Sequence, residues 1–162
     1  MAKIGKYILA TLTTGMYKDA RMIYREYIQN SADQIDTLSA DDRENSLRKT
    51  IVISISPEKR NVVIKDRATG IPEKEFEERL INVADSYKDP AKNKGFRGIG
   101  RLAGLSYCGK LIFRASAPNE SSVSTMEMDC EMLTRILRNP QDRSSASEVM
   151  HKISKCSVEK NI

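Results

Sequence analysis

Two β-branched runs separated by a short polar turn constrain the fold of this chain most strongly. Residues 50–56 read TIVISIS and residues 62–66 read VVIKD, with PEKRN between them. Such runs across a turn of this length predict an antiparallel hairpin. A second pair, KLIFRAS at 110–116 and SVSTMEMD at 122–129, predicts two more strands around a PNE turn. We therefore expect a largely antiparallel sheet.

Helical patterns occupy much of the remaining sequence. The longest runs from about residue 18 to 38, and a second begins at Pro72, a residue favoured at the first helical position. Blocks of helices and strands in this order predict an α+β fold, a two-layer α/β sandwich with a mixed, largely antiparallel sheet. The other predicted segments are helices at 4–12, 102–108 and 131–138, loops at 39–49, 84–100 and 139–148, and a strand at 149–158.

Composition and length narrow the class of protein. The 162 residues suit a single domain, and 40% hydrophobic with 30% charged residues is ordinary for a globular protein. No apolar run approaches the roughly 20 residues of a membrane span. The start, MAKIGKYILATL, is too polar for a secretory signal, so we expect a cytoplasmic protein. A formal charge of +5 without an aromatic-basic stripe argues against nucleic-acid binding by this domain alone.

Cysteine and histidine usage argues against several kinds of site. Cys108, Cys130 and Cys156 are odd in number, scattered and without a CxxC pair, so we interpret them as reduced and structural. His151 is the only histidine. A zinc site or a serine or cysteine triad is therefore not expected.

A polar line interrupts the apolar pattern of the longest predicted helix. Glu26, Asn30 and Asp33 are spaced i, i+4, i+7 within MIYREYIQNSADQID, so all three point the same way. One interpretation is a solvated face, because exposed charges are the norm. The other is a wall of a ligand site.

The stretch KDRATGIP, residues 65–72, ends the second β-branched run. Its Asp66 can accept a hydrogen bond from a ligand amine, and Gly70 removes the side chain where a flat ring could lie against the backbone. A strand-ending turn with an Asx hydrogen bond explains the same residues without a ligand.

A third stretch, KNKGFRGIGRLAG at residues 92–104, is rich in glycine and cations. Gly95, Gly98 and Gly100 precede a helix, so backbone N–H groups and a positive helix N-terminus can face phosphates. It is neither a Walker loop nor a Rossmann fingerprint. A glycine-rich loop without a ligand is the alternative. The basic residues around it, opposed by Asp89 alone, are Lys88, Lys92, Lys94, Arg97 and Arg101.

In this order the three motifs resemble those of the GHKL ATPases, the family of gyrase B, heat-shock protein 90, histidine kinases and MutL. REYIQNSADQID is similar to the family's N-box, IKDRATGIP to its Asp-x-Gly-x-Gly box, and KGFRGIGRLAGLS to its glycine-rich lid motif. ADSYK, at 84–88, is similar to the Ser-x-Lys region before that lid. The resemblance covers roughly residues 4–130 and implies the Bergerat fold, with ATP and Mg²⁺ bound between a helical layer and the sheet.

The resemblance implies a role for each matching residue. Glu26 would be the general base for the attacking water and Asn30 the protein ligand of Mg²⁺. Asp66 would accept from the adenine amine, with Gly70 allowing close approach, and Asp33 would support the site or contact the nucleotide through water. Further nucleotide-binding residues would be Ile71, Ser86, Lys88, Lys94, Gly95, Phe96, Arg97, Gly98, Ile99 and Gly100.

Glu26 also favours one branch of the family. Histidine kinases generally lack a carboxylate there, so its presence implies a hydrolytic, heat-shock protein 90-like ATPase whose lid closes on Mg-ATP and drives homodimerisation. Two alternatives stay open: a nucleotide-binding switch with negligible hydrolysis, and a MutL-like DNA-repair ATPase, which GFRG favours. The partner or client protein is not specified by these motifs.

The chain departs from the family pattern in two places. Ala68 stands where the first glycine of the Asp-x-Gly-x-Gly box is usual, and alanine does not easily adopt a positive φ. The later Gly-Thr element, whose threonine supports the adenine-binding aspartate, is absent from the end SKCSVEKNI. We therefore expect residues 1–162 to be an N-terminal ATP-binding domain without its last strands, with weak or absent turnover.

Overall fold

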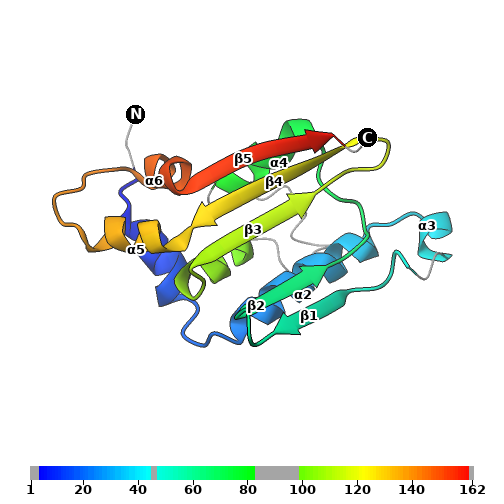
Figure 1. The fold of residues 1–162 in the computed structure, drawn as a ribbon, viewed down its shortest axis with the longest axis horizontal. Helices are drawn as coiled ribbons and strands as arrows, with labels where there is room; N and C mark the ends of the chain where they lie inside the picture. The colour runs from blue at the N-terminus through cyan, green and yellow to red at the C-terminus, as the bar shows by residue number, and fades with distance from the viewer. Residues whose placement is uncertain (1–3, 45–46, 83–98, 161–162) are drawn as a thin grey trace.

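The computed structural model describes residues 4–44, 47–82 and 99–160 (Figure 1). Helices come first, then a strand pair, then a mixture of both. The elements in chain order are α1 (Tyr7–Ala10), the π-helix η1 (Thr11–Gly15), α2 (Met22–Asp36), α3 (Ala40–Glu44), β1 (Val52–Ser56), β2 (Asn61–Lys65), α4 (Glu73–Ile81), the 3₁₀ helix η2 (Gly100–Ser106), β3 (Lys110–Ala115), β4 (Ser122–Asp129), α5 (Cys130–Arg138), α6 (Ala146–Ile153) and β5 (Ser154–Lys160).

The strands form two antiparallel sheets. β1 and β2 make the predicted hairpin, with Ile53 opposite Ile64. β4 lies between β3 and β5 in the second sheet, and it is antiparallel to both. Every strand pair within the described ranges is antiparallel. The α+β class with an antiparallel arrangement is therefore confirmed.

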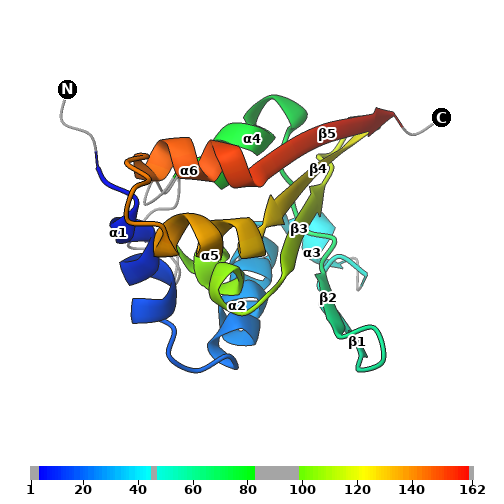
Figure 2. The same ribbon diagram turned by 60° about the vertical axis from the view of Figure 1, so that its left-hand side comes forward.

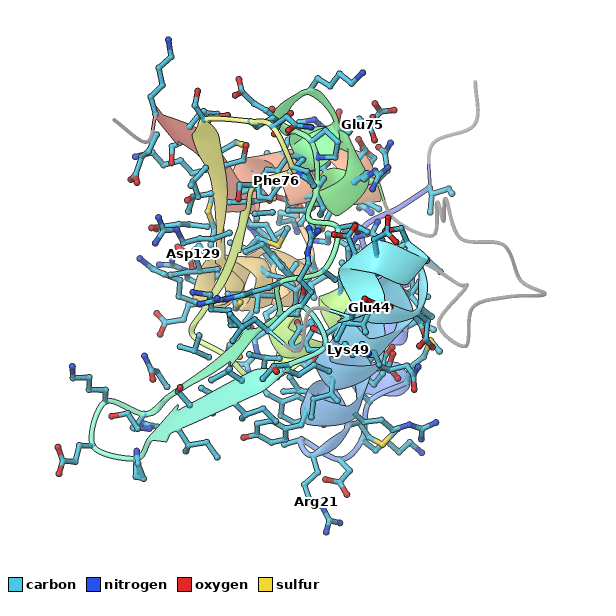
Figure 3. The ribbon with its side chains drawn as sticks, turned by 90° about the vertical axis from the view of Figure 1, so that its right-hand side faces the viewer. Arg21, Glu44, Lys49, Glu75, Phe76 and Asp129 are labelled. Atoms are coloured by element: carbon cyan, nitrogen blue, oxygen red, sulfur yellow. The ribbon has the colours of Figure 1, made fainter. Side chains whose placement is uncertain are left out.

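The core lies between the three-stranded sheet and the helices on one of its faces. In Figure 2, α5 and α6 lie on the same side of β3, β4 and β5. Alternate residues of β4 are buried, and its Met126 and Met128 are almost fully enclosed. Phe76 lies between α4 and the sheet (Figure 3). The fully buried side chains that α5 and α6 contribute are Cys130, Leu133, Val149 and Met150.

Two predicted segments were wrong in type. Residues 149–158 were expected to form a strand, but α6 continues to Ile153 and β5 begins only at Ser154. The physical reason is a capping box, in which Ser145 and Glu148 satisfy the first N–H groups of α6 reciprocally. His151 consequently lies on a helix. The expected loop at 39–49 contains the short helix α3.

The other predicted helices are present with shifted ends. The expected helix at 4–12 is α1 continued by η1, and the helix expected at 102–108 is the 3₁₀ helix η2. Pro72 lies at the N-cap of α4, one position before its first helical residue. Across the described part of the chain, no helix combines the length and apolar character that a membrane crossing requires.

The N-terminal strap, residues 4–6, ties the start of the chain to α5 and α6. Its backbone pairs with residues 144–146, and Ile4 accepts the N–H of Ala146 at 2.9 Å. Lys6 is only 2% exposed. Its ammonium donates to the carbonyl oxygens of Ile136 at 2.7 Å and Asn139 at 2.6 Å, where α5 ends. This buried charge is a second donor to two carbonyl groups at the helix C-terminus, each of which also accepts a backbone N–H at 3.3 Å.

Replacing Lys6 with methionine should therefore destabilise the whole domain. Lys6→Met keeps the aliphatic stem but removes the buried ammonium that donates to the Ile136 and Asn139 carbonyls. We expect a loss of about 1–3 kcal/mol in the free energy of unfolding, measured by urea denaturation. Lys155→Met, at an exposed position of β5, is the control and should change little. Equal stability of the two variants would contradict this role.

Candidate functional site

The polar line of α2 is partly enclosed by the rest of the protein. Asp33 is 3% exposed, and its Oδ1 accepts a hydrogen bond from Gln29 Nε2 at 2.7 Å. Glu26 and Asn30 are both half-buried. A buried carboxylate requires hydrogen-bond donors, which a freely solvated face does not provide. This line of side chains is therefore not a fully solvated face.

α2 also contacts the aspartate that follows β2. Ser31, 6% exposed, donates its hydroxyl to Asp66 Oδ2 at 2.7 Å. The other oxygen, Oδ1, accepts the backbone N–H of Ala68 at 3.1 Å, so the Asx-type turn considered from the sequence is present. Each carboxylate oxygen has two lone-pair directions. These two bonds fix the carboxylate and leave it capacity to accept from a ligand.

Two further side chains hold the loop after Asp66. Thr69 donates its hydroxyl to Gln34 Oε1 at 2.5 Å, a second bond between this loop and α2. Arg48 donates to the carbonyl oxygens of Arg67 and Ala68, each at 3.3 Å, and pairs with Asp42. Sequence reasoning missed Arg48, because the segment before β1 was interpreted as a polar loop and its partners lie about 20 residues away.

Glycine is required at residue 70 rather than at residue 68. Gly70 has a φ of +64°, whereas Ala68 is buried and has no positive φ. A Cβ on Gly70 would lie 1.8 Å from the carbonyl oxygen of Ser116, just after β3. The close approach expected at Gly70 is therefore, in this structure, an approach to the protein's own backbone. The alanine in place of the usual first glycine is compatible with this loop.

Glu26 lies against the beginning of η2. A Cβ on Gly100 would lie 2.4 Å from Oε2 of Glu26, so a larger residue there would displace this carboxylate. Tyr17 is 5% exposed near the same carboxylate. Burial, and secondly the charge of Glu26, raises the pKa of the Tyr17 phenol. Tyr17 thus stays a neutral hydroxyl beside Glu26 at ordinary pH.

Tyr27 fixes α2 to η2. Its hydroxyl donates to the carbonyl oxygen of Arg101 at 2.9 Å and accepts the N–H of Gly104 at 3.1 Å. Its ring meets Phe113 of β3 edge-to-face, with centroids 6.0 Å apart. Burial raises the pKa of this phenol above its usual range. Nothing in the sequence pattern distinguished Tyr27 from an ordinary core residue.

The structure brings together part of the predicted nucleotide-binding set. α2 carries Glu26, Asn30 and Asp33. It contacts Asp66 through Ser31, and Glu26 lies against Gly100. Ile99 is buried and Ile71 packs against the core. The remaining predicted residues lie outside the described ranges: Ser86, Lys88, Lys94, Gly95, Phe96, Arg97 and Gly98.

The side chains on this face of α2 suit a hard cation in their chemistry. Asn30 offers an amide oxygen, and Glu26 and Asp33 on the same helix face offer carboxylates. Within the described ranges, no group of three or more histidine, cysteine or acidic side chains could hold a metal alone. Mg²⁺ typically uses one or two protein oxygens together with water and substrate phosphates. The donors present fit that mode of binding.

One surface hollow lies away from these motifs. A cavity of about 520 Å³ opens where β3, β4 and β5 meet α5. None of its lining residues belongs to the three motifs. They are Gly109, Lys110, Glu127, Met128, Asp129, Glu131, Ile153 and Lys155.

The antiparallel α+β fold places the oxygen-rich helix α2 beside the aspartate that follows β2, as the resemblance to a nucleotide-binding domain implies. The family model described as histidine kinase-, DNA gyrase B-, and HSP90-like ATPase matches residues 20–159. The chain belongs to this family, and its domain is an ATP-binding module of that kind. A search of curated proteins found no match.

Adding one methyl group at residue 70 should destabilise the domain itself. Gly70→Ala forces an alanine into a positive φ and its Cβ into the Ser116 carbonyl. We expect a loss of about 2–5 kcal/mol, from backbone strain and overpacking together, measured by thermal or urea unfolding. Gly5→Ala is the matched control, because a Cβ there meets nothing within 4 Å. A fully stable Gly70→Ala variant would show that the loop does not depend on this contact.

Proposed function

We propose that this chain binds Mg-ATP and hydrolyses it to ADP and phosphate, as the ATPase module of a heat-shock protein 90-like protein. The observation that supports this best is that α2 contacts both other motifs. Ser31 on α2 bonds to Asp66, and Glu26 on α2 lies against Gly100. Residues that are far apart in the sequence thus surround one helix, as binding of one nucleotide by all three motifs requires.

Asp66 recognises the adenine base in this proposal. Its carboxylate accepts a hydrogen bond from the exocyclic amine, while the Ser31 hydroxyl and the Ala68 N–H hold it in place. Ser31 thus supports this carboxylate with a hydroxyl group from α2. The hydrogen bond from Thr69 to Gln34 fixes the position of this loop relative to α2, beside the proposed adenine site.

Glu26 and Asn30 act at the phosphate end. Glu26 orients a water molecule and accepts its proton as it attacks the terminal phosphate. Asn30, one turn away, would hold Mg²⁺ through its amide oxygen, and the metal would supply positive charge for the phosphate oxygens. The Glu26 carboxylate lies close to the Gly100 backbone, and its charge acts on the neutral Tyr17 phenol.

The resemblance further implies phosphate binding by residues 86–98, lid closure over ATP and homodimerisation of the full-length protein. The proposal also includes a cytoplasmic location. A heat-shock protein 90-like branch is favoured by the carboxylate at Glu26. Hydrolysis too slow to measure, with normal ATP binding, would instead favour a nucleotide-dependent switch.

Replacing Glu26 with glutamine should separate binding from hydrolysis. Glu26→Gln keeps the shape of the side chain but removes the proton acceptor. We expect ATP affinity to be unchanged and the rate of phosphate release by the full-length protein to fall by about 10²–10⁴-fold. Isothermal titration and a phosphate-release assay measure the two quantities. Glu159→Gln, an exposed carboxylate on β5, is the control. Unchanged turnover in Glu26→Gln would make the general-base assignment wrong.

Replacing Asn30 with alanine should affect binding only when the metal is present. We expect the ATP affinity of Asn30→Ala to fall by about tenfold in Mg²⁺, because one metal ligand is lost. In EDTA, the affinities of wild type and variant should agree. Asn61→Ala, in the exposed hairpin, is the control. An equal loss in both buffers would mean that Asn30 supports the fold or the nucleotide directly.

A further inference from the structure

The β1–β2 hairpin exposes an aliphatic stripe to solvent. Cross-strand partners share one side of a hairpin, so Ile53 and Ile64 lie beside Ile55 and Val62. Ile53 is 46% exposed, Ile55 67% and Val62 38%. A two-stranded hairpin is only marginally stable in water unless something packs on it. This aliphatic stripe (Ile53, Ile55, Val62 and Ile64) is therefore suited to a partner.

The outer edge of β1 lacks the usual protection against strand pairing. β1 reads VISIS, with no proline and no charge, and its only strand partner among the described residues is β2. In both Figure 1 and Figure 2, β2 lies between β1 and the three-stranded sheet, so the other edge of β1 faces away from the body. Natural edge strands are commonly blocked by lysine, proline or a bulge. β1 instead offers free backbone groups beside the aliphatic stripe.

The charge around the hairpin indicates which kind of strand fits. Lys49, Lys59, Arg60 and Lys65 are exposed, and Glu58 is the only acidic residue between positions 49 and 65. Within the described ranges, none of these four cations is placed in an ion pair. A second copy of the hairpin would bring like charges together at the ends of the paired strands. An acidic strand would meet opposite charge instead.

We propose that the open edge of β1 binds an extended segment of a partner protein in which aliphatic and acidic residues alternate. The segment adds a third strand to the hairpin by backbone hydrogen bonds. Because side chains alternate between faces, its aliphatic residues lie beside Ile53 and Ile55 on the face of the aliphatic stripe. Its acidic residues at the ends lie near Lys49, before β1, and near Lys59 and Arg60 in the turn. This interaction does not depend on the proposed ATPase activity.

The test uses a synthetic peptide of alternating valine and glutamate, labelled for fluorescence anisotropy. We expect saturable binding that weakens with added salt, and slowed amide exchange of β1 residues in the complex. Ile55→Lys should weaken binding by about tenfold or more, because it places a charge in the aliphatic stripe. Lys59→Glu with Arg60→Glu should weaken it similarly. Val158→Lys, on the edge strand β5 and 47% exposed in the wild type, should bind normally.

Control peptides make the proposal falsifiable. Alternating serine and glutamate should bind at least about tenfold more weakly, since it lacks the aliphatic side chains. Equal binding of valine–lysine and valine–glutamate peptides would overturn the charge argument. Concentration-dependent dimers abolished by Ile55→Lys would identify a second copy as the occupant and overturn the proposal. Binding of DNA or anionic vesicles through Lys59 and Arg60, without peptide binding, would also overturn it. Unchanged thermal unfolding of each variant shows that the fold is intact.

Discussion

The hydroxyl of Tyr27 is the contact on which the arrangement of the site depends. It bonds to both the Arg101 carbonyl and the Gly104 N–H, so one side chain fixes α2 against η2. One turn further along the helix, Ser31 bonds to Asp66. α2 is thereby held at two points about one turn apart. Glu26 and Asn30 take their positions from this anchoring rather than from contacts of their own helix.

The strands were predictable because local signals specify them. The hairpin of β1 and β2 and the pair of β3 and β4 each follow from β-branched runs across short polar turns. Most helices followed from periodicity. α6 was mistaken for a strand, although its capping box at Ser145 and its apolar residues Val149, Met150 and Ile153 fit a helix. The mixed composition of that segment concealed the helical spacing.

The site was only partly predictable, for a physical reason. The motifs predicted roles for Glu26, Asn30 and Asp66, because their chemistry and spacing are local properties of the chain, and these roles stay predictions. Their supports were not identifiable, since Ser31 and Asp66 are 35 residues apart in the sequence, and Tyr27 and Arg101 are 74 apart. Such contacts arise only after the helix packs. The close contact at Gly70 was equally unpredictable, because its neighbour Ser116 follows β3, far from Gly70 in the sequence.

The N-terminal strap has a consequence for how the chain is made. Lys6 bonds to carbonyls that lie 130 and 133 residues later in the sequence. At ribosomal speeds of about 5–20 residues per second, roughly 6 to 26 seconds separate the synthesis of Lys6 from that of residues 130 positions later. Throughout that interval the lysine has no native partner and its ammonium stays in water. Closure of the domain is therefore a late, long-range step, and its first residues are among the last to find their place.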